Sequence, residues 1–230
     1  MDKEIIVELK NIAKRYYNPQ GELEILKKID LQILKGDRIA ILGPSGVGKT
    51  TLLNIIGTLD KPTSGEIYYF GKELNWDREE DVLKLRREKI GFIFQLHYLI
   101  PEFTVIENLI LPGLISKWKI KDCLKRAEEI LNILNLSQRA QHKPYALSGG
   151  ERQKVAIGRA IFLNPVLLLA DEPTGNLDPE SAEEVVNIFL KINQTFGTTI
   201  VMVTHNWELA KKMKRNYLLK NGFLVKLEKI

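Results

Sequence analysis

Residues 43–50 form a glycine-rich segment whose residue types suit phosphate binding. The segment consists of Gly43, Pro44, Ser45, Gly46, Val47, Gly48, Lys49 and Thr50, with Thr51 directly after it. Glycines let a backbone wrap closely around an anion, so that several N–H groups point inward. Lys49 offers a charge to the β- and γ-phosphates of a nucleotide, and the Thr50 hydroxyl is a suitable Mg²⁺ ligand. The segment therefore predicts a nucleotide site.

Two acidic residues, whose type suits a role in catalysis, follow a second segment, an apolar run. Val166–Ala170 is a continuous apolar run of the kind found in buried strands, and Asp171 and Glu172 come directly after it. Ligands of parallel α/β sheets bind at the carboxyl ends of the strands. We expect Asp171 to hold Mg²⁺ or its waters, and Glu172 to accept a proton from an attacking water.

The elements that must position these residues alternate between strands and helices. Arg38–Leu42 is a compact apolar run directly before the glycine-rich segment, and a helix is expected over Thr50–Leu59. This alternation predicts an α/β fold with a mainly parallel sheet. Further strands are expected at Ile90–Phe94 and Thr199–Val203, and a short helix is expected to end near Arg215.

Two regions depart from this alternation. β-like runs at Glu4–Lys10 and Lys28–Leu34 come first, and an Asn221-Gly222 hairpin lies near the end. Residues 104 to about 136 have a helical pattern. We expect one domain over 1–230, with 1–94 and 164–230 as the nucleotide-binding core and 95–163 as an inserted helical lobe.

Composition limits the class of protein. The 230 residues are 44% hydrophobic and 27% charged, and the net charge of +5 is spread along the chain, so we expect no nucleic-acid partner. The single cysteine, Cys123, suits packing in a reducing compartment. Residues 1–4 lack the apolar run of a signal peptide, and the most apolar stretches are too short to span a bilayer. Any membrane role would then come through another chain.

Leu147, Ser148, Gly149, Gly150 and Glu151 resemble the signature motif of the ATP-binding subunits of ABC transporters. Together with the glycine-rich segment and the two acids, this resemblance covers essentially the whole chain. It implies a P-loop NTPase (RecA-like) core with an N-terminal antiparallel β subdomain and an inserted α-helical subdomain. It also implies an ATPase that uses ATP and Mg²⁺.

The same resemblance suggests roles for further residues. Gln95 matches the glutamine that contacts Mg²⁺ and the water region, and His205 matches the histidine that faces the γ-phosphate. Asp178 matches the last residue of the D-loop. Tyr16 matches the aromatic residue that stacks on adenine, although Tyr17 is adjacent and stays an alternative.

The signature residues imply a second copy of the chain. Ser148, Gly149 and Gly150 open a helix expected over Glu151–Leu163, so their backbone N–H groups can meet an anion. In the family, that anion is the γ-phosphate held by the partner, and two chains enclose two ATP molecules. Position 151 is glutamate where glutamine is commonest in the family.

The family also implies a transmembrane permease subunit and a place on the cytoplasmic face of the inner or plasma membrane. We expect Tyr98, Leu99, Ile100 and Phe103 to help form the groove for that subunit, the alternative being that they pack the inserted lobe. The stretch 91–104, followed by Glu107-Asn108 and Leu111-Pro112, is similar to the lipoprotein-release and macrolide-export branch, and so are residues 53–57 and 60–65. Amino-acid importers, the cell-division cassette and non-transport ABC ATPases are the alternatives.

Overall fold

A six-stranded sheet lies at the centre of the fold, and the computed structural model describes residues 4–19 and 21–228. Its strand order is β10-β9-β3-β8-β7-β6, and only the β9–β10 pair is antiparallel among these described strands. The strands are β3 (Arg38–Leu42), β6 (Ile90–Ile93), β7 (Leu167–Asp171), β8 (Thr199–Thr204), β9 (Arg215–Lys220) and β10 (Phe223–Leu227). The predicted mainly parallel sheet is confirmed.

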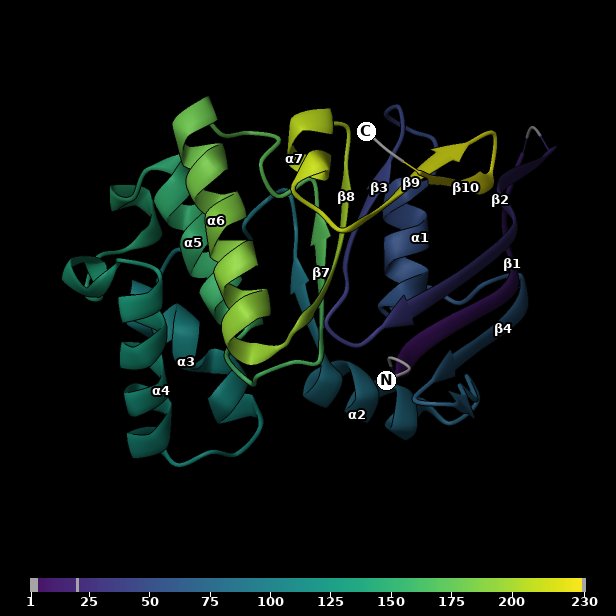
Figure 1. The fold of residues 1–230 in the computed structure, drawn as a ribbon. Helices are drawn as coiled ribbons and strands as arrows, with labels where there is room; N and C mark the ends of the chain where they lie inside the picture. The colour runs from purple at the N-terminus through teal and green to yellow at the C-terminus, as the bar shows by residue number, and fades with distance from the viewer. Residues whose placement is uncertain (1–3, 20, 229–230) are drawn as a thin grey trace.

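A second sheet stands beside the first and is antiparallel (Figure 1). Its order is β2-β1-β4-β5. The strands are β1 (Ile5–Asn18), β2 (Gly21–Leu34), β4 (Ser64–Tyr69) and β5 (Lys72–Glu73). This is the antiparallel β unit that the sequence predicted at the N-terminal side.

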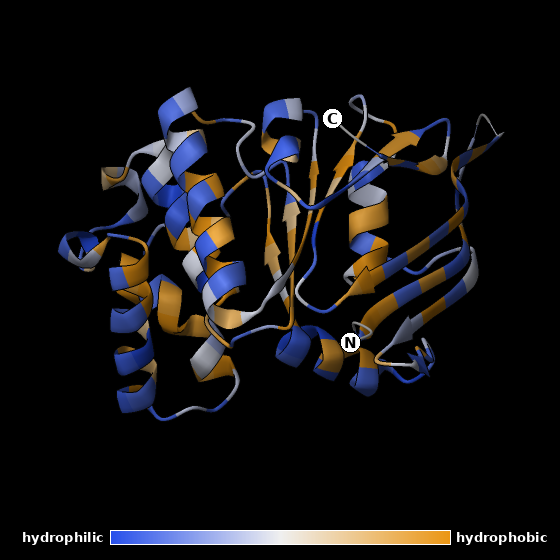
Figure 2. Cartoon of the chain, in the orientation of Figure 1, coloured by the Kyte–Doolittle hydropathy of each residue, from blue (hydrophilic) through white to orange (hydrophobic). Residues whose placement is uncertain are grey.

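Helices cover both faces of the central sheet (Figure 1). They are α1 (Lys49–Ile56), α2 (Glu79–Lys89), α3 (Val105–Ile115), α4 (Ile120–Ile133), α5 (Gly149–Ala160), α6 (Pro179–Phe196) and α7 (Trp207–Lys211), with 3₁₀ turns at Ser137–Arg139 and Pro144–Ala146. Figure 2 shows the central strands almost wholly hydrophobic, whereas α4 and α6 mix hydrophobic and hydrophilic residues. The strands β3, β7 and β8 are buried on both faces, and these helices are buried on one side.

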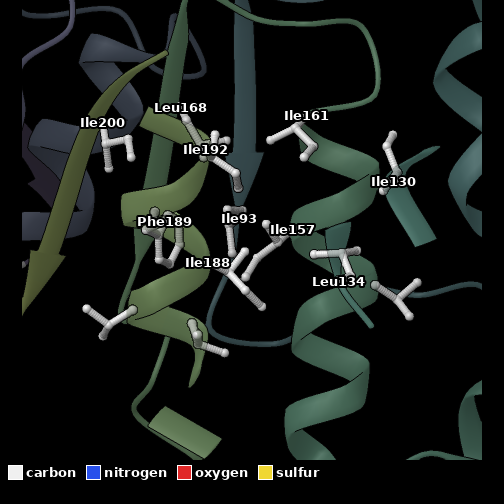
Figure 3. Packing of buried hydrophobic residues seen from close by; sticks show 14 of the residues in the cluster. Ile93, Ile130, Leu134, Ile157, Ile161, Leu168, Ile188, Phe189, Ile192 and Ile200 are labelled. Carbon is white, nitrogen blue, oxygen red and sulfur yellow. The ribbon is translucent and has the colours of Figure 1, made fainter. Parts of the chain in front are cut away.

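Alternate residues of each central strand pack into two different cores. Leu168 of β7 lies in a core with residues of α3, α4, α5 and α6, part of which is drawn in Figure 3. Leu169, the next residue, lies in a core with α1, β1 and β2. Successive side chains of a strand point to opposite faces. Helices α1 and α5 therefore lie on opposite faces of the central sheet.

Some elements differ from the expected bounds. β1 and β2 are each 14 residues long, about twice the predicted runs. Their pairing shifts register between Leu9 and Ile12 and again on either side of Lys14, and Asn11 has φ 52. Such bulges interrupt the period of two by which strands are recognised, which is why the sequence pattern ended early.

The helical bounds also differ in detail. α1 ends at Ile56 because Gly57 follows and Thr58 has φ 61, so the predicted extension to Leu59 is wrong. The helical pattern over 104–136 divides into α3 and α4 around Lys117, which has φ 61. Arg215, expected near the end of a helix, begins β9 instead.

Candidate functional site

The glycine-rich segment joins β3 to α1, so it lies at the carboxyl end of a central strand and at a helix N-terminus. Gly48 is the N-cap of α1 with φ 103, and a Cβ there would lie 2.5 Å from Ile25 Cγ2. Both the backbone angle and the close approach of β2 require glycine. The helix N-terminus and the adjoining backbone N–H groups suit a bound anion.

Lys49 points back across this segment. Its Nζ donates to the carbonyl oxygens of Gly43 at 2.9 Å and Pro44 at 3.1 Å, and it lies 3.4 Å from Glu172 Oε1. Its side chain is only 6% exposed. The ammonium group is therefore held inside the loop, where it joins the loop to the acid pair.

Thr50 and Asp171 meet beside Lys49. The Thr50 hydroxyl donates to Asp171 Oδ1 at 3.1 Å. Burial raises the pKa of Asp171, the Thr50 hydrogen bond opposes that rise, Glu172 adds to it, and Lys49 opposes it. A hydroxyl and a carboxylate at this spacing are oxygen ligands of the kind that Mg²⁺ prefers.

The other acid, Glu172, is fixed from three sides. Its Oε2 accepts from the backbone N–H of His205 at 3.2 Å and lies 3.0 Å from His205 Nδ1, while Lys49 approaches Oε1. Its own N–H donates to Val203 O at 3.0 Å. Glu172 has φ 43, a left-handed conformation that a non-glycine residue rarely adopts. The strand ends β7 and β8 thus hold one carboxylate against one imidazole.

Gln95 follows β6 and reaches the same edge of the sheet. A Cβ placed on Gly175 would lie 3.4 Å from Gln95 Nε2 and 3.6 Å from Glu172 Cβ. The Gln95 amide and the Glu172 side chain thus border the same small volume at Gly175. Of the residues predicted from separate segments, Lys49, Thr50, Gln95, Asp171, Glu172 and His205 lie together here.

Tyr16 lies on β1 at the edge of this site. Its hydroxyl donates to Asp60 Oδ2 at 2.7 Å, and the Thr51 side chain of α1 is close enough to affect its pKa. The neighbouring Tyr17 is 74% exposed and pairs with Glu22 in the β1–β2 ladder. Successive side chains of a strand point to opposite faces, so the two rings lie on opposite sides of β1. Tyr16 is the one that lies next to α1.

The signature residues form the N-terminus of α5. The Ser148 hydroxyl accepts from Glu151 N at 3.1 Å, and Glu151 Oε2 accepts from Ser148 N at 2.8 Å, which is a capping box. Arg139 Nε donates to Glu151 Oε1 at 3.0 Å. The hydrogen bond from the Ser148 backbone lowers the pKa of Glu151, as does Arg139. Glutamate at position 151 is thus part of the helix cap.

Asp178 caps the neighbouring helix α6 and accepts from Ser181 N at 2.9 Å. A Cβ on Gly150 would lie 2.8 Å from Ser181 Oγ, so the first turns of α5 and α6 touch. The signature residues and Asp178 form one corner of the molecule. Helix α5 at this corner and helix α1 after the glycine-rich loop lie on opposite faces of the central sheet.

The segment expected to dock a membrane subunit is only partly exposed. Tyr98 is 61% exposed, has φ 45 and meets the Phe94 ring edge-on at 5.4 Å, whereas Leu99, Ile100 and Phe103 are half-buried. The adjacent cleft is lined by residues other than these four. They include Phe92, Phe94, Pro112, Arg159 and Leu163.

Sequence reasoning also missed Lys14 and Asp60. Lys14 Nζ contacts Asp60 Oδ1 at 2.6 Å beside Tyr16. The spacing of Lys14 and Tyr16, two residues apart on a strand, was a readable signal, but Asp60 follows α1 and is 46 positions from Lys14. In the part of the chain that the structure describes, no cluster of three or more His, Cys, Asp or Glu could hold a metal alone.

Comparisons with known proteins agree with this geometry. The family described as "ABC transporter" matches residues 26–175. The chain is 46% identical over 222 residues to the "Lipoprotein-releasing system ATP-binding protein LolD" of Francisella tularensis subsp. tularensis (strain FSC 198), with 96% of each chain covered. It is 50% identical over 202 residues to the protein of the same name from Aquifex aeolicus (strain VF5), covering 88% of this chain and 90% of that one.

Solved structures are similar over nearly the full length. The dimeric structure of MJ0796, described as a bacterial ABC transporter cassette, has a TM-score of 0.87 and 42% identity, with 98% of this chain and 100% of that chain covered. A dimeric post-hydrolysis state of MJ0796 bound to ADP and Pi gives the same values. CbiO1 from Clostridium perfringens has a TM-score of 0.87 at 27% identity, covering 97% of this chain and 88% of that one.

Proposed function

The chain belongs to the ABC transporter family of ATP-binding subunits, and on that premise we propose that it hydrolyses ATP to drive a separate membrane subunit. The observation that carries the proposal is the Glu172 carboxylate. It is held between Lys49 and His205 at the carboxyl ends of β7 and β8, beside a phosphate-binding loop. A carboxylate so placed can accept a proton from a water that attacks the terminal phosphate.

The surrounding residues have complementary roles in this proposal. The loop of Gly43–Thr51 binds the phosphates through backbone N–H groups and Lys49. Thr50, Asp171 and Gln95 would hold Mg²⁺, which when bound offsets charge on the phosphate oxygens. His205, whose backbone N–H binds Glu172, would face the γ-phosphate. Tyr16 would stack on adenine.

We further propose that two copies form the complete site. Ser148, Gly149, Gly150 and Glu151 would meet the γ-phosphate held by the other copy, with Asp178 at the same junction. This assignment is supported by the placement of α1 and α5 on opposite faces of the central sheet and by the dimeric cassettes at 42% identity. Residues 95–163 act as a lobe that carries α5 in this arrangement.

The membrane partner is proposed from the relatives. Both LolD proteins are named as ATP-binding proteins of a lipoprotein-releasing system, and we assign this chain to a system of that kind. No helix within the described ranges is long and apolar enough to cross a membrane. The chain would therefore act at the cytoplasmic face of the membrane by docking on a permease subunit through Tyr98 and the cleft beside it.

Phosphate release tests the proposal most directly. Glu172→Gln should bind ATP yet lower the steady-state hydrolysis rate by about 100-fold or more, because the amide cannot accept the proton. The matched control is Glu208→Gln, an exposed acid paired with Lys211, which should keep the wild-type rate. Normal hydrolysis by Glu172→Gln would show that another group is the base.

A further inference from the structure

Asp60 links two side chains of β1 that lie beside the phosphate-binding loop. Its Oδ2 accepts from the Tyr16 hydroxyl at 2.7 Å, and its Oδ1 accepts from Lys14 Nζ at 2.6 Å. Lys14 Nζ also donates to Lys61 O at 2.8 Å. Each carboxylate oxygen thus has its own donor, and the charge of Lys14, whose side chain is 11% exposed, is balanced by Asp60.

The same lysine lies against the tyrosine ring. Lys14 Nζ is 4.9 Å from the centroid of Tyr16, within the range of a cation–π interaction. Lys14 and Tyr16 both bond to Asp60, so their side chains lie on the same side of β1. The ring is therefore held at its hydroxyl by Asp60 and near its π-face by Lys14, and it is still 42% exposed.

The turn that carries Asp60 is fixed to the same strand. Thr63 N donates to Ala13 O at 2.9 Å, and Arg15 N donates to Thr63 Oγ1 at 3.0 Å. This turn follows α1, whose first residue is Lys49 of the loop. The phosphate-binding loop, α1 and the turn with Asp60 are thus one continuous stretch of chain. Because the turn is hydrogen-bonded to β1, this stretch fixes both the loop and Asp60 relative to β1.

The pKa of the phenol is consistent with this environment. Burial raises the pKa of Tyr16, the hydrogen bond to Asp60 raises it further, and the Thr51 side chain opposes the rise. The hydroxyl thus lies between Asp60 and α1. Tyr17 is 74% exposed, and among the contacts of the described residues it has no hydrogen bond to Asp60 or Thr51.

From this geometry we propose that Asp60 and Lys14 are positioning residues that hold the Tyr16 ring in the place where the adenine of ATP stacks. The inference rests on the proposed stacking role of Tyr16 and extends it. Asp60 fixes the ring through the hydroxyl, and Lys14 neutralises Asp60 and covers part of the ring, leaving its exposed part for the base. The same contacts favour Tyr16 over Tyr17 as the residue that stacks on adenine.

Two ligands separate positioning of the base from damage to the loop. Calorimetric titration of the purified chain without Mg²⁺, which prevents turnover, would compare ATP with inorganic tripolyphosphate, which has no base. Tyr16→Phe keeps the ring but loses the anchor, and Asp60→Asn loses the charge that holds both partners. Each should raise the Kd for ATP about threefold to tenfold, the scale of the net contribution of one typical hydrogen bond. The Kd for tripolyphosphate should not change.

Matched controls are available for both substitutions. Tyr17→Phe changes the neighbouring tyrosine, and Asp77→Asn changes a nearby acid that is 90% exposed and pairs with Lys61 at 3.8 Å. Both should bind ATP as the wild type does. A double variant, Tyr16→Phe with Asp60→Asn, should be little weaker than either single variant, since both remove the same contact.

Tyr16→Ala distinguishes failure of this inference from failure of the stacking role. If Tyr16→Ala binds ATP normally, the stacking role is wrong and the positioning role falls with it. If Tyr16→Ala weakens ATP binding while Tyr16→Phe and Asp60→Asn do not, the ring stacks without needing its anchor, and the inference is overturned alone. Equal weakening of ATP and tripolyphosphate binding would also overturn it, because Asp60 would then act on the loop.

Discussion

Single residues of the site are held by contacts on more than one side. Glu172 is bound by the backbone N–H of His205, by its imidazole and by Lys49. A carboxylate with three fixed neighbours has a defined direction, which general-base catalysis requires. The left-handed backbone at Glu172 places the side chain across the ends of β7 and β8, and such strained residues persist where the surrounding structure fixes them.

Glu151 gives a prediction about pH at the residue scale. Its pKa is lowered, first by the Ser148 backbone hydrogen bond and also by Arg139. An acid whose folded-state pKa is lowered contributes stability above its unfolded pKa, and that contribution is lost as pH falls through the lowered value. Glu151→Gln keeps the capping box but not the charge. Its free energy of unfolding should fall below the wild type by about 1 kcal/mol or less at pH 7, and this difference should shrink as the pH falls through the lowered pKa of Glu151.

Denaturant unfolding from pH 3 to pH 7 would measure this difference. Glu107→Gln in the second capping box, where Thr104 also lowers the pKa of the acid, is the comparison because no arginine pairs with Glu107 among the described ion pairs. The difference in unfolding free energy between Glu107→Gln and the wild type should depend on pH less than the difference for Glu151→Gln. If the unfolding free energies of Glu151→Gln and the wild type differ by the same amount at every pH in this range, the Glu151 charge does not stabilise the fold.

At the scale of elements, α5 is tied to the segment after β6. Arg159 of α5 donates to the carbonyl oxygens of Tyr98 at 2.7 Å and His97 at 2.9 Å. Gln95 lies two residues before His97 and reaches the acid site. The helix that begins with the signature residues is thus fixed to the segment proposed to contact the membrane subunit.

Tyr98 permits a prediction about that contact. Replacing it with glutamate places a charge on a surface that should become buried against an apolar partner. Copurification of the membrane subunit should fall about tenfold or more, the scale of an aromatic anchor at an interface, while hydrolysis by the isolated chain stays near normal. Tyr145→Glu, at a tyrosine that is 80% exposed, is the control. Unchanged copurification of Tyr98→Glu would mean that this residue lies outside the contact.

At the scale of the whole molecule, α1 and α5 lie on opposite faces of the central sheet, and the proposal of a shared site assigns the loop and the signature residues of one chain to two different nucleotides. Two copies related by a two-fold axis would form two identical sites. Each site would take its loop from one copy and its signature residues from the other.

Mixing two inactive variants tests this arrangement. Lys49→Ala damages the loop and Ser148→Arg damages the signature, so each alone should hydrolyse almost no ATP. In a mixed dimer, one site combines both defects and the other has neither. Random pairing makes about half of the dimers mixed, so about a quarter of the wild-type phosphate release should return. If the mixture stays inactive, although cross-linking shows that mixed dimers form, the shared site is wrong.

The sequence by itself predicted the candidate site residues and determined most of the elements. The glycine-rich segment, the Asp171-Glu172 pair and the apolar strand before them are local patterns, because phosphate binding and strand burial depend on neighbouring residues. The β1–β2 pair was predicted too short, since its bulges break the period of two. Tyr16 and Tyr17 could not be separated without knowing which face of β1 packs toward α1.

Only the tertiary structure decided which distant residues meet. Asp60 reaches Tyr16 across 44 positions, Glu172 reaches His205 across 33, and Arg159 reaches Tyr98 across 61. Such contacts depend on strand order and on the face each helix covers, and no short pattern in the chain encodes either of these. The same holds for α1 and α5, since only the tertiary structure decided that they cover opposite faces of one sheet.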